Sequence, residues 1–170
     1  RRIVVMLYEE GSRSAGVQLR NIFEGSSINA FTGDRAAIYG TIESCLVEYG
    51  VIRSACWFHG RHYLVDAYIS DKRMGPLIEM TNTLFRIERE CADKPVWLRL
   101  QYRQKYSLPI VDAIMRRLKA IRGDTSYGTL AQRAARYILD DEQAFRMFLT
   151  DGRIMMHNNT AERMFRHIAM

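Results

Sequence analysis

Asp34 is the first residue of this sequence whose type and position could do chemistry. It follows Gly33 at the end of the segment "SINAFTGD", which is typical of a short strand. A carboxylate on a rigid strand can bind a divalent cation, and two cations that act together need a second carboxylate from another element. The ordinary alternative is that Asp34 caps a helix beginning near Ala36, because aspartate is a favoured N-cap residue.

Glu162 is the candidate for that second carboxylate. It lies in the closing segment "MHNNTAERMFRHIAM", where Asn158–Thr160 supply residues that can cap a helix whose first turn contains the glutamate. A glutamate with Arg163 and Arg166 nearby is more commonly part of an exposed ion pair. Asp34 and Glu162 are far apart in the sequence, so spacing alone leaves a shared metal site as a hypothesis.

Cys56 and His59, in the segment "CWFH", are the other residues with ligand chemistry. This pattern is half of a zinc site, but structural zinc takes four ligands, and no second Cys or His pair with suitable spacing follows. The run "VIRSACWFHG" predicts a strand, in which residues three apart point to opposite faces, which argues against a catalytic Cys–His pair. We therefore expect Cys56 and Trp57 to be packed inside and His59 to lie with Arg61 near a site at the sheet's edge.

The charge balance favours an anionic partner. The 25 Lys and Arg against 19 Asp and Glu give a net charge of +6 and a sequence pI near 9.4. Most of the excess is arginine, whose planar guanidinium suits phosphate, so nucleic acid is the leading candidate. A single basic residue is most simply solvated, but arginines three residues apart share one side of a helix and could contact backbone phosphates. The candidate DNA-binding residues are Arg61, Arg133, Arg136, Arg153, Arg163 and Arg166.

The cysteines and the absent motifs limit the function further. Cys45, Cys56 and Cys91 are scattered and odd in number, which argues against a disulfide framework and predicts a cytoplasmic location. No apolar stretch approaches the length of a membrane span, and the first residues do not follow a signal-peptide pattern. A glycine-rich phosphate loop, a serine nucleophile motif and a dinucleotide fingerprint are all missing, so kinase, hydrolase and dehydrogenase functions have no support.

Strands and helices are predicted to alternate in the first third of the chain. The β-branched run Ile3–Leu7 indicates a buried strand, and a helix follows that ends at Gly25. "SINAFTGD" supplies a second strand, "RAAIYGTIESCLVEYG" a helix closed by Gly50, and "VIRSACWFHG" a third strand. This order predicts a parallel α/β sheet with Asp34 at the carboxyl end of a strand, where such sheets place their sites.

Beyond His62 the pattern becomes helical. From Tyr63 to about Ile121 no convincing strand is present, and "PLIEMTNTLFRIERECA" and "LPIVDAIMRRLKAI" have the spacing of amphipathic helices. Pro109 is tolerable only in the first turn of the second one. "TSYGTLAQRAARYILDDEQAFRMFLTDG" adds further helix, broken near Asp140 and ended by Gly152. The sequence therefore predicts an all-α block between the strands and the closing segment.

Three ordered motifs resemble those of the insertion-sequence family 66 transposases. "FTGDRAAIYG" is similar to the family's Gly-x-x-x-Asp-Gly-Tyr-x-x-Tyr region, with Asp34 and Tyr39 in register. "ACWFHGRHYLVDA" resembles its Cys-Trp-Ala-His-x-Arg-Arg block, and "DGRIMMHNNTAERMFRHIAM" its closing DGR, DNN and AER signature. "RIERE" and "SLPIVDAI" lie where the family has comparable helices, so the resemblance spans nearly the whole chain.

The resemblance implies a fold and an activity. The expected fold is an α/β RNase H-like core of the DDE type, with an all-α insertion before the last catalytic helix. Residues 1–62 would belong to the core, 63–150 to the helical insertion and 151–170 to the end of the core. In such proteins three carboxylates bind two Mg²⁺ or Mn²⁺ ions that promote in-line attack on a phosphodiester. The implied function is DNA strand cleavage and strand transfer during transposition, on transposon ends and target DNA, by a homo-oligomeric assembly.

Matching by motif assigns roles to individual residues. Asp34 corresponds to the second catalytic, metal-binding acid of the family and Glu162 to the third, while Cys56, His59 and Asn159 match supporting positions. The family's first aspartate lies on a strand upstream of the part matched here. We therefore expect a core truncated at its start, and we expect the isolated chain not to cut DNA.

Some motif positions depart from the family pattern, and alternatives follow from them. Arg35–Ala36 stands in place of Gly-Tyr, His62 in place of the second Arg, His157 in place of the Asp of DNN, and His167 in place of Pro. The alternative is a catalytically inactive DNA-binding or assembly module from a degenerate element. A helical binding protein with no DNA role is a third possibility, which absent or salt-insensitive DNA binding would favour.

Overall fold

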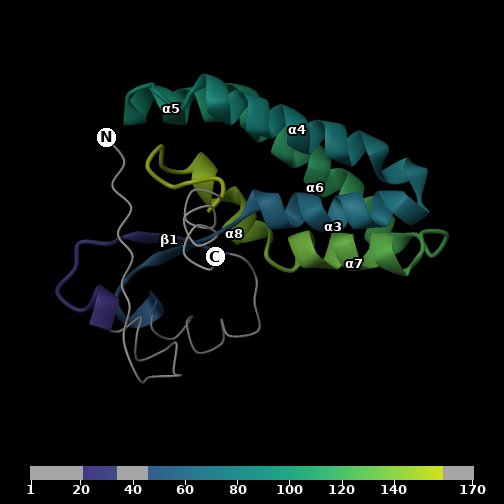
Figure 1. Ribbon diagram of the computed structural model, residues 1–170, viewed down its shortest axis with the longest axis horizontal. Coiled ribbons are helices and arrows are strands. Elements are labelled where there is room, and N and C mark those ends of the chain that lie inside the picture. Colours follow the sequence, from purple (N-terminus) through teal and green to yellow (C-terminus); the bar gives the residue numbers. More distant parts are fainter. Residues whose placement is uncertain (1–20, 34–45, 159–170) are drawn as a thin grey trace, which may run out of the picture.

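A small parallel sheet joined to a larger helical block is seen in the computed structural model, which describes residues 21–33 and 46–158 (Figure 1). Strands β1 (Ala30–Gly33) and β2 (Ile52–Ala55) pair in parallel, with Gly33 opposite Ala55. Helical turns at residues 21–23 and 46–48 precede them and end at Gly25 and Gly50, whose φ angles are +68° and +65°. These left-handed conformations favour glycine, so both predicted helix ends are confirmed.

The rest of the described chain is helical, as the sequence predicted for the block that follows the strands. The helices are α3 (Trp57–Ser70), α4 (Gly75–Glu90), α5 (Val96–Tyr102), α6 (Leu108–Gly123), α7 (Thr129–Leu139) and α8 (Glu142–Arg146). Two 3-10 turns, η1 (Lys72–Met74) and η3 (Met147–Leu149), and the π-helical turn η2 (Arg103–Ser107) connect them. Pro109 lies in the first turn of α6, and the break near Asp140 separates α7 from α8, so both predictions are confirmed.

The predicted third strand is wrong at its carboxyl end. The strand β2 stops at Ala55, and "WFH" forms the first turn of α3 rather than the end of a strand. The Trp57 side chain is completely buried and its indole Nε1 donates to the Phe145 carbonyl at 2.8 Å. The backbone N of Trp57 donates to the Met156 carbonyl at 3.0 Å. These two contacts, one with α8 and one with the closing segment, hold the chain in the turn that starts the helix.

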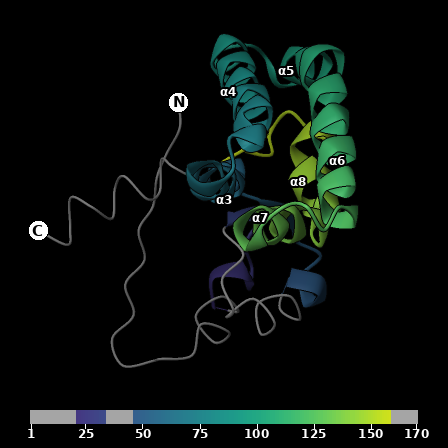
Figure 2. The ribbon, with the colours of Figure 1, turned by 90° about the vertical axis from the view of Figure 1, so that its right-hand side faces the viewer.

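Four helices form the centre of the block. Helix α3 packs against α4 and α7, and α6 packs against the same two, so the four enclose one apolar interior (Figures 1 and 2). Leu64, Leu84, Ile114 and Ile138 contribute one fully buried side chain from each helix. The same core cluster continues to Trp57 at the end of the sheet. Ala55 of β2 belongs to this cluster too, whereas Phe23, Leu46 and Val51 form a second, smaller cluster against which Phe31 of β1 packs.

A buried arginine joins the helices to the closing segment. The guanidinium of Arg103 has no exposed surface, and its Nε donates to the Glu88 carboxylate at 2.9 Å. Its Nη1 donates to three backbone carbonyls, those of Phe148, Asp151 and Ile154, at 2.9, 3.1 and 3.0 Å. A buried charge is tolerated only when it is paired and hydrogen-bonded, and here one side chain satisfies both conditions while linking three segments.

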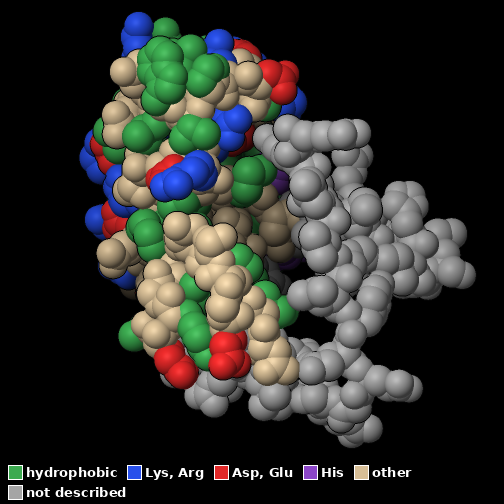
Figure 3. All heavy atoms as spheres, turned by 90° about the vertical axis from the view of Figure 1, so that its left-hand side faces the viewer, with side chains coloured by type: hydrophobic (Ala, Val, Ile, Leu, Met, Phe, Trp, Pro, Cys, Tyr) green, Lys and Arg blue, Asp and Glu red, His purple; other side chains and the backbone are tan. Residues whose placement is uncertain are grey.

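The surface at the end of the molecule where α5 lies is mixed in character. Figure 3 shows hydrophobic side chains there among basic and acidic ones. Trp97 is 63% exposed and Val96 45% exposed, and both belong to α5. Within residues 21–33 and 46–158, no helix has the length and apolar character needed to cross a membrane.

Replacing Arg103 with methionine should sharply destabilise the chain. The Arg103→Met variant leaves the Glu88 carboxylate, two buried carbonyls and one part-buried carbonyl without their donor, and breaking such a pair costs about 3–5 kcal/mol. Urea unfolding followed by circular dichroism measures this loss of free energy. The control is Arg86→Met, since Arg86 forms an exposed pair with Glu90 and its loss should cost less than about 1 kcal/mol. Equal effects of the two substitutions would contradict the anchoring role of Arg103.

Candidate functional site

The carboxyl edge of the sheet is where the sequence predicted a site. At this edge the chain leaves β1 after Gly33 toward Asp34, and it leaves β2 after Ala55 toward α3. The backbone N of Cys56 donates to the Gly33 carbonyl at 2.9 Å, which extends the parallel pairing to the last residue of β1. Asp34 itself lies outside the described residues. The strand that leads to it is nevertheless fixed directly beside the start of α3.

The closing segment crosses the same edge of the sheet. The hydroxyl of Thr32, two residues before Asp34, donates to the Met155 carbonyl at 3.1 Å. The next residue, Met156, is buried and accepts from the Trp57 backbone N at 3.0 Å. The chain segments that lead to Asp34 and to Glu162 are therefore hydrogen-bonded to each other. Glu162 lies outside the described residues, as do Asn159, Arg163 and Arg166.

Cys56 and His59 take positions at the start of α3. Cys56 is buried at the N-cap position, and His59 is half-buried in the first turn, with its ring centroid 6.3 Å from that of Phe58. The prediction that the two side chains point to opposite faces of a strand is wrong, because the strand ends before them. The predicted packing of Cys56 and Trp57 is confirmed. In the described ranges, no cluster of three or more His, Cys, Asp or Glu residues could hold a metal ion.

The DGR motif at Asp151–Arg153 forms a tight structural joint. A Cβ atom on Gly152 would lie 2.1 Å from the Val96 carbonyl oxygen at the start of α5, so only glycine fits. The Gly152 carbonyl accepts from Arg99 Nη1 at 3.0 Å. Hydrogen bonds from Arg153 hold the pKa of the Asp151 carboxyl below its usual range, and the same contact raises the pKa of Arg153. The motif thus docks the closing segment onto the helical block.

The predicted DNA-binding arginines in the described part differ in their surroundings. Arg153 is held by Asp151, with Nη2 and Oδ2 separated by 2.6 Å. Arg133 and Arg136 are exposed on α7, and the Arg133 guanidinium lies 5.2 Å from the centre of the Tyr63 ring. Neither forms an ion pair with any residue that the structure describes. Their placement on one helix agrees with the spacing argument, whereas DNA contact by these residues stays a prediction.

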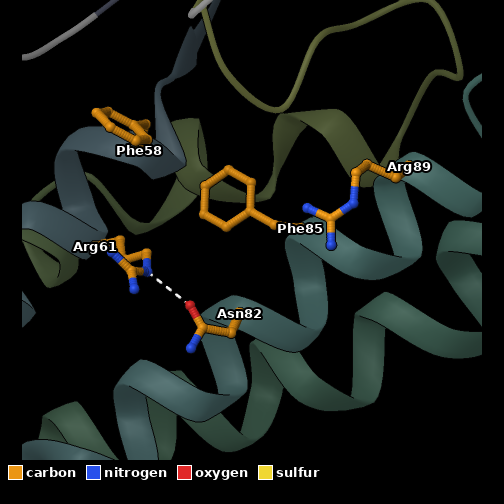
Figure 4. A pocket seen from close by; sticks show the side chains of 5 residues that line it. All are labelled: Phe58, Arg61, Asn82, Phe85 and Arg89. Atoms are coloured by element: carbon orange, nitrogen blue, oxygen red, sulfur yellow. Dashed lines mark hydrogen bonds between the residues drawn. The ribbon is translucent and has the colours of Figure 1, made fainter.

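A pocket lies between α3 and α4, beside the start of α3. It has a volume of about 360 Å³ and is lined by Phe58, Arg61, Asn82, Phe85 and Arg89 (Figure 4). Arg61 Nε donates to the Asn82 side-chain oxygen at 2.8 Å. Of these residues only Arg61 was singled out from the sequence. A signal for the others exists, because Asn82, Phe85 and Arg89 recur at the spacing of one helix face.

The described residues thus combine a small two-stranded parallel sheet with a mostly helical block. The chain belongs to the Transposase IS66 family, whose family model matches residues 3–170. Membership of this DDE-type family implies an RNase H-like fold and, generally, the use of divalent metal ions.

Two curated relatives come from Sinorhizobium fredii. The uncharacterized protein y4qI is 34% identical over 116 residues, which cover 66% of this chain and 21% of the relative. The uncharacterized protein y4hP is 32% identical over 93 residues, which cover 55% of this chain and 17% of the relative. The chain thus spans about a fifth of the length of the curated relatives that it matches. No solved structure is significantly similar to it.

Substituting Gly152 with alanine should weaken the joint between the closing segment and α5. The added methyl group would collide with the Val96 carbonyl, and overpacking of this kind costs about 1–3 kcal/mol. Gly123→Ala is the matched control, because a Cβ there meets nothing within 4 Å and Gly123 does not have a positive φ. Thermal unfolding of both variants tests the difference. An unchanged melting temperature in Gly152→Ala would show that the joint is not close-packed.

Proposed function

We propose that the chain is part of the catalytic core of a DDE-type transposase. In this proposal residues 1–62 and 151–170 belong to an RNase H-like core, and residues 63–150 form a helical insertion. The proposed activity is metal-dependent DNA strand cleavage and strand transfer during transposition of an insertion sequence. The supporting observation is the hydrogen bond from Thr32 to Met155, which joins the segments that lead to Asp34 and to Glu162. Carboxylates from distant parts of the chain can share metal ions only if their segments meet.

Asp34 and Glu162 are the proposed metal ligands, because carboxylate oxygens are the ligands that Mg²⁺ and Mn²⁺ prefer. When bound, such ions activate the attacking oxygen and stabilise the leaving oxygen of a phosphodiester. The chain's own contribution is positioning. The Thr32 hydroxyl and the Trp57 backbone N hold the carbonyls of Met155 and Met156, in the segment that precedes Glu162 in the sequence. Cys56, His59 and Asn159 are proposed to support the ligands rather than to react.

DNA is the proposed partner, as transposon ends and as target, bound in a homo-oligomeric assembly. The net charge of +6 favours a polyanion, and Arg133 and Arg136 present two exposed cations on one face of α7. Phosphate contacts from this helix would position the DNA without reading its sequence.

An inactive DNA-binding or assembly module is the second candidate. His157, which replaces an aspartate of the family motif, lies with its ring centroid 5.7 Å from that of Phe85. An imidazole packed against an aromatic ring does not supply the acidic oxygen that an aspartate would offer at this position. The two candidates share the DNA contacts and differ in whether the carboxylates support cleavage.

Neutral substitution of either carboxylate should remove cleavage by the full-length gene product. Asp34→Asn and Glu162→Gln keep the size and polarity of the side chain but remove the charge that holds the ions. We expect the rate of cleavage of labelled element ends in Mg²⁺ to decrease about 100-fold or more. Mn²⁺ binding, followed by electron paramagnetic resonance, should weaken in the same variants.

Glu79→Gln is the control for charge loss, since Glu79 is exposed on α4 and far from the sheet edge in sequence. It should leave cleavage and Mn²⁺ binding unchanged. Full DNA affinity with no cleavage by the unsubstituted protein would favour the inactive module. Cleavage that persists in Asp34→Asn would refute the assignment of that residue.

The α7 arginines should contribute to the salt dependence of DNA binding. Arg133→Gln and Arg136→Gln should each reduce the slope of log affinity against log salt by about one, because each removes one phosphate contact. Fluorescence anisotropy with duplex DNA at several salt concentrations measures the slope. Arg86→Gln is the control, since Arg86 is paired with Glu90. Unchanged slopes in both α7 variants would place the DNA elsewhere on the protein.

A further inference from the structure

The pocket between α3 and α4 is built from two facing helix stripes. Phe58 and Arg61 are three residues apart on α3, and Asn82, Phe85 and Arg89 follow one face of α4 (Figure 4). The volume of about 360 Å³ falls in the usual range of small-ligand sites, about 300–1,000 Å³. Among the described residues, none that lines the pocket is acidic. The pocket is therefore shaped for a ligand that combines a flat apolar part with negative charge.

The two arginines of the pocket are not paired with any carboxylate in the part of the chain that the structure describes. Neither Arg61 nor Arg89 forms an ion pair within the described part of the chain. Most other described arginines are paired, and these are Arg53, Arg73, Arg86, Arg103, Arg122, Arg146 and Arg153. The Asn82 oxygen accepts from Arg61 Nε, which orients the guanidinium without neutralising it. Two oriented or exposed cations without a carboxylate partner favour an anion such as a phosphate group.

The aromatic rings supply the flat apolar surface. Phe58 lies in the first turn of α3 and is 43% exposed, whereas the preceding residue, Trp57, is fully buried. The Phe58 and Phe85 ring centroids are 6.5 Å apart and their planes meet at 79°. Because His157 already packs against the Phe85 ring, Phe58 offers the more open face, and a planar group can stack on it while its edge contacts Phe85. Base stacking on aromatic side chains is tolerant of sequence and stabilises single-stranded nucleic acid.

We propose that this pocket binds one unstacked nucleotide of a DNA strand, with the base against Phe58 and Phe85 and a phosphate held by Arg61 and Arg89. The proposal rests on the proposed function, which supplies DNA as the ligand. Stacking and phosphate contact together account for the two kinds of side chain in the pocket. A free phosphate ion would need only the arginines, and a docked apolar protein segment would need only the rings.

The place of the pocket in the fold fits this role. Phe58 comes three residues after Ala55, which pairs with Gly33 at the carboxyl end of the parallel strands. Parallel sheets place their reacting groups at this edge, and Asp34 follows Gly33 directly in the sequence. A nucleotide held in the pocket would be displaced from the duplex close to the proposed cleavage site. The pocket would thereby position the strand for the carboxylates.

The test compares two DNA duplexes with the full-length gene product. One carries a single extrahelical 2-aminopurine, a fluorescent base, and the other has the same base paired. We expect tighter binding of the extrahelical duplex, by about tenfold, and a change of 2-aminopurine fluorescence on binding. Phe85→Leu and, independently, Phe58→Leu should remove most of this preference while leaving affinity for the paired duplex within about twofold. Arg89→Gln should weaken binding of the extrahelical duplex more than that of the paired one.

Matched controls separate the pocket from general effects. Trp97→Leu removes an exposed aromatic ring outside the pocket, and Arg86→Gln removes a paired arginine from the same helix as Arg89. Both should keep the preference and the fluorescence change.

Three outcomes would overturn the proposal, and they are distinguishable. Equal affinity for both duplexes with no fluorescence change refutes the nucleotide pocket and leaves the proposed function standing. If Arg89→Gln loses the preference for the extrahelical duplex while both phenylalanine variants keep it, the pocket is a simple phosphate site instead. Absence of any DNA binding by the unsubstituted protein refutes both the pocket and the proposed function.

Discussion

The buried guanidinium of Arg103 is the contact on which the arrangement of the described chain depends. It reaches the Glu88 carboxylate on α4 and three carbonyls between Phe148 and Ile154, so one side chain joins two helices to the closing segment. Desolvating a guanidinium costs several kcal/mol, and this cost is offset only while all partners stay in place. The contact therefore acts as an all-or-none constraint: the closing segment follows its observed path, or the charge is left unsatisfied in the core.

The path of the closing segment in turn positions the sheet edge. Between the Arg103 contacts, Gly152 lies against the start of α5; beyond them, the Met155 and Met156 carbonyls accept hydrogen bonds from the Thr32 hydroxyl and the Trp57 backbone N. The two hydrogen bonds from Thr32 and Trp57 bridge more than half of the chain in sequence. They connect the helical block, the parallel strands and the segment toward Glu162 in one continuous structure. A site assembled from distant carboxylates requires such connections, because each carboxylate is positioned only as rigidly as the segment that carries it.

Sequence patterns predicted local structure well and long-range contacts poorly, for physical reasons. The helices over α4 and α6 and the ends at Gly25 and Gly50 follow from periodicity and backbone conformation, which neighbouring residues determine. The end of β2 was missed because the apolar run continues through Trp57, and short apolar runs suit strands and helices alike. The contacts of Trp57 with the distant Phe145 and Met156 carbonyls favour the helix. Of the predicted site residues, Asp34 and Glu162 lie outside the described residues, so their assignment rests on motif. The aromatic lining of the pocket had no sequence signal beyond helix spacing.

A net positive charge does not by itself say which arginines meet a ligand. Composition treats the arginines as equivalent, yet Arg103 is a core residue, Arg153 holds the DGR turn, and Arg61 and Arg89 face a pocket without a carboxylate partner in the described ranges. Pairing removes a guanidinium from the field that an approaching polyanion experiences, because the neighbouring carboxylate cancels its charge. Among the described residues, exposed arginines without a printed ion pair lie on α6 and α7 as well as in the pocket, and under the proposed function these are the positions where a polyanion would be attracted. The partner that each arginine has in the folded chain therefore determines whether its charge is available to a ligand.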